Sequence, residues 1–132
     1  MNIKEKALTY LARREYSKKE LETKLSPLFS NDEIKETLEY LEDKNLLSDV
    51  RYCQSYIASR LRKNPEGKEL LILRLKSKGI DSVMARNEVN NYFIDNEDQI
   101  SDIYKKYKEK IFRLKGPDKG KTFLFKKQIR VD

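Results

Sequence analysis

Apolar side chains recur along the chain at spacings of three and four residues, the period of an amphipathic helix. Over residues 1–47 this pattern predicts three helices, at about 3–14, from Ser17 to near Pro27, and from Ser30 to near Asn45. Ser17 with Glu20, and Ser30 with Glu33, have the spacing of a capping box at a helix start. The three apolar stripes are Ile3, Ala7, Tyr10 and Leu11; Leu21, Leu25 and Leu28; and Ile34, Leu38 and Leu41. Leu46 and Leu47 are expected in a turn packed on this core.

The pattern starts again at Ser48. A fourth helix is expected over 48–62, a fifth around 68–75, and a sixth that Asp81 caps. The stripes of the fourth and sixth helices are Tyr52, Cys53, Tyr56, Ile57 and Leu61, then Ala85, Val89, Tyr92 and Phe93. Between them, residues 68–75 are apolar on nearly all sides of a helix, with Pro65 expected at its first turn and Gly79 at its end. Such a helix is usually buried among neighbours. The alternative is one buried face and one exposed patch that a partner covers.

The two halves repeat each other. Ala7, Tyr10 and Leu11 match Cys53, Tyr56 and Ile57 at an offset of 46. Leu21 and Leu25 match Leu71 and Leu75 at an offset of 50, and Phe29 matches Ile80 at 51. Repeats of this length indicate stacked helical modules. Cys53 occupies the position of Ala7, which indicates a small core residue rather than a reactive thiol.

A third copy begins near residue 95 with a long helix, whose apolar residues are Ile100, Ile103, Tyr104, Tyr107, Ile111 and Leu114. Gly116 and Pro117 interrupt it, and residues 119–129 are expected to form an eighth helix in which Phe123 and Phe125 need cover. The prediction is an all-α, elongated tandem array of three-helix modules. Its parts are a first module at 1–47, a second at 48–95, and an incomplete third at 96–132.

Composition supports helices and argues against several kinds of function. Charged residues make up 39% of the 132 residues, with four Gly and three Pro. No stretch approaches the ~20 apolar residues of a membrane span, and the first residues lack a signal-peptide core, so a cytoplasmic monomer without membrane contact is expected. The single Cys and the absence of His leave no ligand set for structural zinc and no usual general base. With no phosphate-binding glycine loop either, neither a cofactor nor catalysis is expected.

The net charge of +7 is unevenly distributed. It is −1 over residues 1–47, +3 over 48–95 and +5 over 96–132. This gradient suggests a polyanion or an acidic groove as partner, although solvated helix faces alone would give the same charges. The clusters with few interspersed acids are the candidate binding residues: Arg60, Arg62, Lys63, Arg74, Lys78, Lys105, Lys106, Lys108, Lys110, Arg113 and Lys115.

Several strings in order resemble the RecX family, the regulators of the bacterial recombinase RecA. They are the run at 7–15 beginning with Ala7; Ser17, Glu20, Leu21, Lys24 and Leu25; Glu33 and Ile34; Tyr40 and Leu41; the run at 47–60 beginning with Leu47; and Leu75, Lys78, Gly79 and Ile80. The segments 63–67 and 26–29 differ from the pattern. The resemblance covers residues 6–93 and implies a tandem array of three-helix modules that binds in the groove of the RecA–DNA filament.

The same resemblance implies that the protein restrains the ATPase, strand-exchange and co-protease activities of RecA, or alters filament growth. On this interpretation the candidate cations contact RecA on single-stranded DNA, with possible weak contact to the DNA itself. The alternative is a basic helical protein that binds DNA through phosphate contacts alone. That alternative requires tight binding to naked DNA with a steep dependence on salt.

Overall fold

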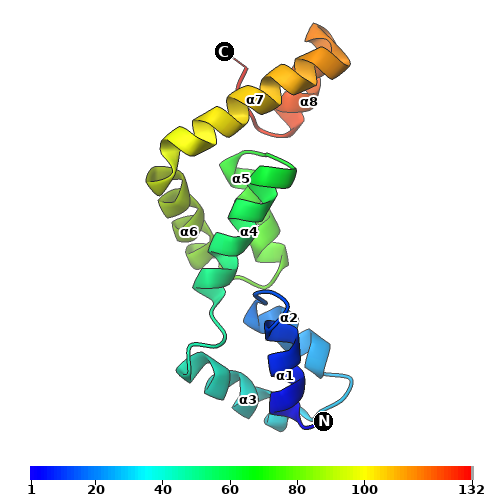
Figure 1. Ribbon diagram of the computed structural model, residues 1–132, viewed down its shortest axis with the longest axis vertical. Helices are drawn as coiled ribbons and strands as arrows, with labels where there is room; N and C mark the ends of the chain where they lie inside the picture. Colours follow the sequence, from blue (N-terminus) through cyan, green and yellow to red (C-terminus); the bar gives the residue numbers. More distant parts are fainter. Residues whose placement is uncertain (132) are drawn as a thin grey trace.

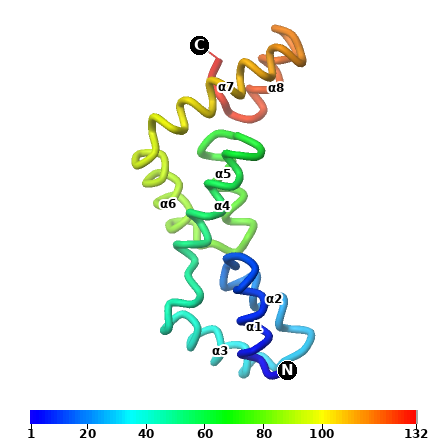
Figure 2. Tube along the Cα trace, in the orientation of Figure 1, coloured from blue at the N-terminus to red at the C-terminus, as the bar shows by residue number. Residues whose placement is uncertain are grey.

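The computed structural model describes residues 1–131, which form eight α-helices and no strand. The helices are α1 (Ile3–Leu11), α2 (Lys18–Leu25), α3 (Asn31–Asp43), α4 (Asp49–Lys63), α5 (Lys68–Ser77), α6 (Ser82–Asp95), α7 (Glu97–Lys115) and α8 (Pro117–Lys126). They follow one another along an elongated molecule, with α1–α3 at one end and α7–α8 at the other (Figures 1 and 2). The all-helical prediction is confirmed.

The N-terminal core is formed by α1, α2 and α3. Its buried side chains are Ala7, Tyr16, Leu21, Leu25, Ile34, Leu38, Leu41 and Leu47. The capping box at Ser17 is present in full, whereas the Ser30 hydroxyl accepts the Glu33 N–H and donates to the Glu33 carboxylate. Leu28 was expected in this core but is 60% exposed, because α2 ends at Leu25, two residues before Pro27.

The first helix ends earlier than predicted, whereas the third ends near Asn45 as predicted. Helix α1 stops at Leu11. After the turn that follows, the ring centroids of Tyr10 and Tyr16 lie 5.7 Å apart, and the Arg14 guanidinium lies over the Tyr16 ring. Helix α3 stops at Asp43, after which Asn45 adopts a positive φ of 58°. This reversal buries Leu47 as expected but leaves Leu46 44% exposed, so the prediction that both leucines pack on the core is wrong at Leu46.

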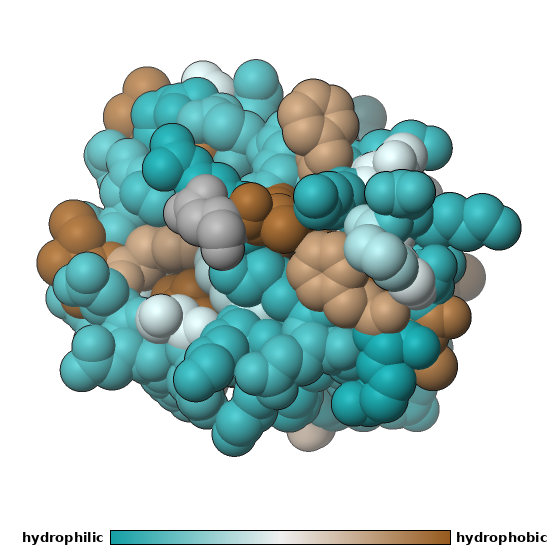
Figure 3. Space-filling view, turned by 90° about the horizontal axis from the view of Figure 1, so that it is seen from above, coloured by the Kyte–Doolittle hydropathy of each residue, from teal (hydrophilic) through white to brown (hydrophobic). Residues whose placement is uncertain are grey.

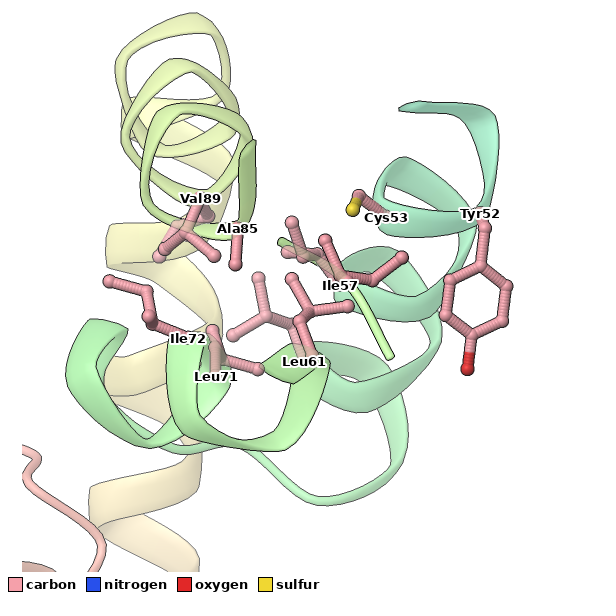
Figure 4. Close-up of a cluster of buried hydrophobic side chains, with 11 residues drawn as sticks. Tyr52, Cys53, Ile57, Leu61, Leu71, Ile72, Ala85 and Val89 are labelled. Carbon is pink, nitrogen blue, oxygen red and sulfur yellow. The ribbon is translucent and has the colours of Figure 1, made fainter. Parts of the chain in front are cut away.

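The middle core is formed by α4, α5 and α6 and is extended by the first half of α7. Figure 4 shows Ala85 and Val89 of α6 facing Leu71 and Ile72 of α5 and Leu61 of α4. Cys53 is fully buried in this cluster, and burial raises the pKa of its thiol to about 12, which agrees with a core role. Tyr56, Tyr92 and Phe93 are half-buried at its edge.

The apolar helix α5 is buried on one side rather than on nearly all sides. Leu71, Ile72 and Leu75 are buried, but Leu73 is 60% exposed, so the prediction of burial all round is wrong at that position. Pro65 was expected in the first helical turn and instead lies buried in the loop before Lys68, where α5 begins. Gly79 does end the helical segment, with a φ of +90°.

A third cluster joins α7 to α8 and contains Ile111, Leu124 and Ile129. Helix α8 begins at Pro117, which suits a first helical position, and ends before Gln128, whose φ is +59°. Phe123 is half-buried and packs against this cluster, while Leu114 and Phe125 are exposed at 66% and 81%. Ile100 of α7 follows the boundary at 95/96 in sequence but packs in the middle core. The division between the second and third modules at this boundary therefore stays a proposal.

The N-terminal and middle parts are joined at the start of α2. The Ser17 hydroxyl donates a 2.8 Å hydrogen bond to the carbonyl of Lys78, and the Lys18 N–H donates to the Asp49 carboxylate at 2.8 Å. A Cβ added to Gly79 would collide with the Cβ and Cγ atoms of Lys19. The absence of a side chain at Gly79 therefore permits this close approach as well as the positive φ.

Gly79→Ala is expected to lower the free energy of unfolding by about 1–3 kcal/mol, because it combines an unfavourable φ with this collision. In a Lys19→Gly background the loss should be smaller, since the colliding atoms are gone. Urea denaturation of the four proteins in this double-mutant cycle measures the difference. An equal loss in both backgrounds would contradict the contact between Gly79 and Lys19.

Candidate functional site

Glu66 is a buried carboxylate in the loop between α4 and α5, and its side chain is 0% exposed. Arg60 of α4 donates from Nε to Glu66 Oε1 at 3.1 Å, and Arg74 of α5 donates to the same oxygen. The second oxygen, Oε2, is also buried and has no hydrogen-bond partner within residues 1–131. The two arginines therefore supply the charge that compensates Glu66 and fix the loop to both helices.

The same loop holds the C-terminal helices. The Tyr104 hydroxyl of α7 donates to the backbone carbonyl of Glu66 at 2.6 Å, and the Gly67 N–H donates to the carbonyl of Lys127 at 2.8 Å. Lys127 Nζ donates to Asn64 Oδ1 at 2.7 Å. Burial raises the pKa of Tyr104 and lowers that of Lys127. We call residues 60, 64–67, 74, 104 and 127 the Glu66 junction.

Gly67 is required at this junction because a Cβ there would collide with the backbone oxygen and Cβ of Gln128. The loop and the segment after α8 are thus in direct backbone contact. The expectation that nearby acids leave Arg60 and Arg74 only partly neutralised is wrong. Both are half-buried and bonded to Glu66, a single acid that a count of charges along the chain underrates.

A groove next to the junction brings together four of the expected cations. It has a volume of about 440 Å³ and lies between the end of α4, the end of α6 and α7. Arg62, Lys63, Lys106 and Lys110 line it, and all four are exposed. Its apolar lining consists of Ala58, Leu61, Pro65, Tyr92, Ile100, Ile103 and Tyr107. We call this the α4–α7 groove.

Charge within the groove is largely uncompensated. Lys106 pairs with Asp102 one turn earlier at 3.0 Å, and both side chains are more than half exposed. Within residues 1–131, Arg62, Lys63 and Lys110 take part in no ion pair. The groove can therefore attract an anionic group over an apolar surface.

The other expected cations are dispersed. Lys105 and Arg113 are exposed on α7 outside the groove, and Lys108 is half-buried. Lys115 Nζ lies 4.6 Å from the centre of the Phe123 ring, so this α7 side chain contacts α8. Lys78 is exposed at the junction between the N-terminal and middle parts. The structure thus places eleven candidates in at least four separate environments.

The end of the molecule formed by α7 and α8 is predominantly hydrophilic, with apolar side chains at several separate points (Figure 3). A second hollow of about 860 Å³ lies beside α8 and includes Phe125 and Ile129. Residues 1–131 contain no group of three or more acidic or cysteine residues placed to hold a metal ion. None of the described helices is long and apolar enough to cross a membrane.

Known proteins match this chain over most of its length. A family model described as RecX, first three-helix domain, matches residues 4–41. Regulatory protein RecX of Neisseria gonorrhoeae (strain NCCP11945) is 32% identical over 124 residues, which are 93% of this chain and 80% of that protein. The chain belongs to the RecX family.

Other RecX proteins extend the match. Regulatory protein RecX of Clostridium perfringens (strain 13 / Type A) is 32% identical over 98% of this chain and 60% of its own length. A crystal structure of RecX from Lactobacillus salivarius superposes with a TM-score of 0.73 at 28% identity, covering 95% of this chain and 84% of that one. A second crystal structure, of regulatory protein RecX, has a TM-score of 0.76 at 18% identity and supports the fold. The family and fold inferred from the sequence are confirmed.

The parts of the candidate site that the sequence did not predict lie near the Glu66 junction. The string 63–67 departs from the RecX pattern, and it contains the buried carboxylate. One signal was available: Glu66 is the only acid between Asp49 and Glu69 in a basic stretch. A lone acid among arginines is a candidate for burial, because buried carboxylates need cationic partners.

Proposed function

We propose that this protein binds in the groove of the RecA filament on single-stranded DNA and restrains its ATPase, strand-exchange and co-protease activities. Membership of the RecX family supports RecA as the partner. The observation that supports a binding surface on this chain is the α4–α7 groove, where Arg62, Lys63, Lys106 and Lys110 surround apolar residues. An elongated molecule (Figure 1) suits a long groove, and the potentials of the four cations around the α4–α7 groove add up there.

The proposed role is non-catalytic. The protein acts by occupying sites on the filament, so its effect should saturate with binding and require no turnover of its own. A cytoplasmic location follows from a partner that works on chromosomal DNA. DNA binding through phosphate contacts alone is the second candidate. The net charge of +7 supports it.

The test is the RecA ATPase on single-stranded DNA, titrated with the protein. Wild-type protein is expected to inhibit it to saturation. Arg62→Glu/Lys63→Glu/Lys110→Glu is expected to weaken inhibition at least about tenfold, or ~1.4 kcal/mol, because it reverses exposed cations of the groove without touching Glu66. Arg60 and Arg74 are left unchanged, because reversing them would place carboxylates beside Glu66.

The matched control is Lys119→Glu/Lys121→Glu/Lys126→Glu on α8, which changes the net charge equally at exposed positions outside the groove. Its inhibition should stay within about threefold of wild type. Equal weakening by both variants would assign the effect to net charge and support the phosphate-binding alternative. Absence of inhibition by the folded wild-type protein would contradict the proposed function.

A further inference from the structure

We propose that the α4–α7 groove binds an acidic peptide segment carrying one large apolar side chain, contributed by the protein component of the filament rather than by its DNA. This inference rests on the proposed function, since it specifies what one site on the chain holds. It assigns the groove a ligand chemistry that the family name does not give.

The apolar lining is continuous with the middle core. Leu61 and Ile100 are buried members of that cluster, and the half-buried Ile103 packs against it. Their positions are therefore fixed by the fold before any ligand arrives. A volume of about 440 Å³ lies within the range of ~300–1,000 Å³ typical of ligand sites. Such a floor gains most from an apolar side chain that is withdrawn from water.

The rim is cationic on both sides. Arg62 and Lys63 end α4, while Lys106 and Lys110 lie four residues apart on one face of α7. The exposed pair of Lys106 with Asp102 contributes little stability, so a ligand carboxylate can replace Asp102. Carboxylates flanking an apolar residue would meet these cations on each side. An acidic peptide thus complements the floor and the rim together.

Single-stranded DNA complements the rim but not the floor. Proteins that bind it without sequence preference stack bases on aromatic rings. Here the apolar lining has five aliphatic residues and two tyrosines, and both tyrosines are half-buried. The phosphate backbone offers no apolar group to fill the remaining space. The geometry therefore favours a peptide over a nucleic acid.

Photo-crosslinking identifies the occupant directly. Gln99→p-benzoylphenylalanine places the crosslinker at an exposed position that lines the groove, and Lys121→p-benzoylphenylalanine on α8 serves as the control position. The full chain is irradiated while bound to RecA filaments on single-stranded DNA. The expected product joins position 99 to a RecA segment with at least two acidic residues within three positions of a large apolar one. Position 121 should not give that product.

A crosslink from position 99 to DNA, to a neutral or basic RecA segment, or to nothing would overturn the assignment. As an independent measurement, Lys106→Glu/Lys110→Glu should weaken ATPase inhibition at least tenfold, whereas Lys121→Glu/Lys126→Glu should change it less than threefold. Wild-type inhibition that neither variant weakens more than threefold would reject the groove and leave the proposed function standing. Wild-type protein that neither inhibits nor binds filaments would reject both.

Discussion

Replacing Arg60 and Arg74 together by Met is expected to lower the free energy of unfolding by about 3–5 kcal/mol, the usual result of leaving a buried charge uncompensated. The side chain of Glu66 is inaccessible to water, and its Oε1 receives both guanidinium groups. Met preserves most of the length and apolar contact of each arginine, so the loss reports the charge. Urea denaturation followed by circular dichroism measures it.

The triple variant Arg60→Met/Arg74→Met/Glu66→Leu should regain at least half of that loss, because it removes the stranded carboxylate. Apolar replacement of a whole buried ion cluster is often neutral or stabilising. Arg62→Met, at an exposed position between the two, is the control and should stay within about 0.5 kcal/mol of wild type. A double variant as stable as this control would contradict the compensation of Glu66 by the arginines.

Leu71→Ala is expected to lower the free energy of unfolding by about 2–5 kcal/mol, the range for a buried leucine whose removal leaves a cavity. Leu71 is fully buried in the middle core, between α4 and α6 (Figure 4). The same result is expected for Leu75, which is also fully buried. Thermal or urea denaturation gives the difference from wild type.

Leu73→Ala is the matched control, since it makes the same chemical change two residues away on the same helix. Leu73 is 60% exposed, so its truncation should cost less than about 0.5 kcal/mol. The contrast between the two leucines tests the orientation of α5. Similar losses at both positions would mean that α5 is covered on the side where Leu73 lies.

Helices and their starts were predictable because their signals are local. Ser17, Ser30, Ser48 and Asp81 all cap helices through their side chains, and for Ser17 and Ser30 the spacing to Glu20 and Glu33 indicated it. Helix ends were less predictable, since they depend on where the chain must turn back to bury a distant residue. The turn that ends α1 at Leu11 and buries Tyr16 is an example.

The orientation of α5 could not be read from its composition. Leucines on all sides of a helix do not say which face has a neighbour, and the elongated arrangement leaves the side bearing Leu73 uncovered. Phe125 and Leu114 illustrate the same limit at the C-terminal end. Burial there depends on which elements pack side by side, and that is a tertiary property.

The candidate site was predicted in part. Proximity in sequence found the cations at the end of α4 and on α7, and the structure places Arg62, Lys63, Lys106 and Lys110 around one groove. The pairing of Arg60 and Arg74 with Glu66 joins residues six and eight positions apart through a non-helical loop. No helical spacing rule connects them, so charge counting assigned both to the surface.

The most direct test of the account is a comparison of binding to RecA filaments and to naked single-stranded DNA at 150 mM salt, near physiological ionic strength. Fluorescence anisotropy of the labelled protein can follow both. We predict saturable binding to filaments at least tenfold tighter than to naked DNA, with a shallower dependence on salt. Equal affinity for the two, with a steep salt slope in both cases, would contradict recognition of RecA and identify a phosphate-binding protein.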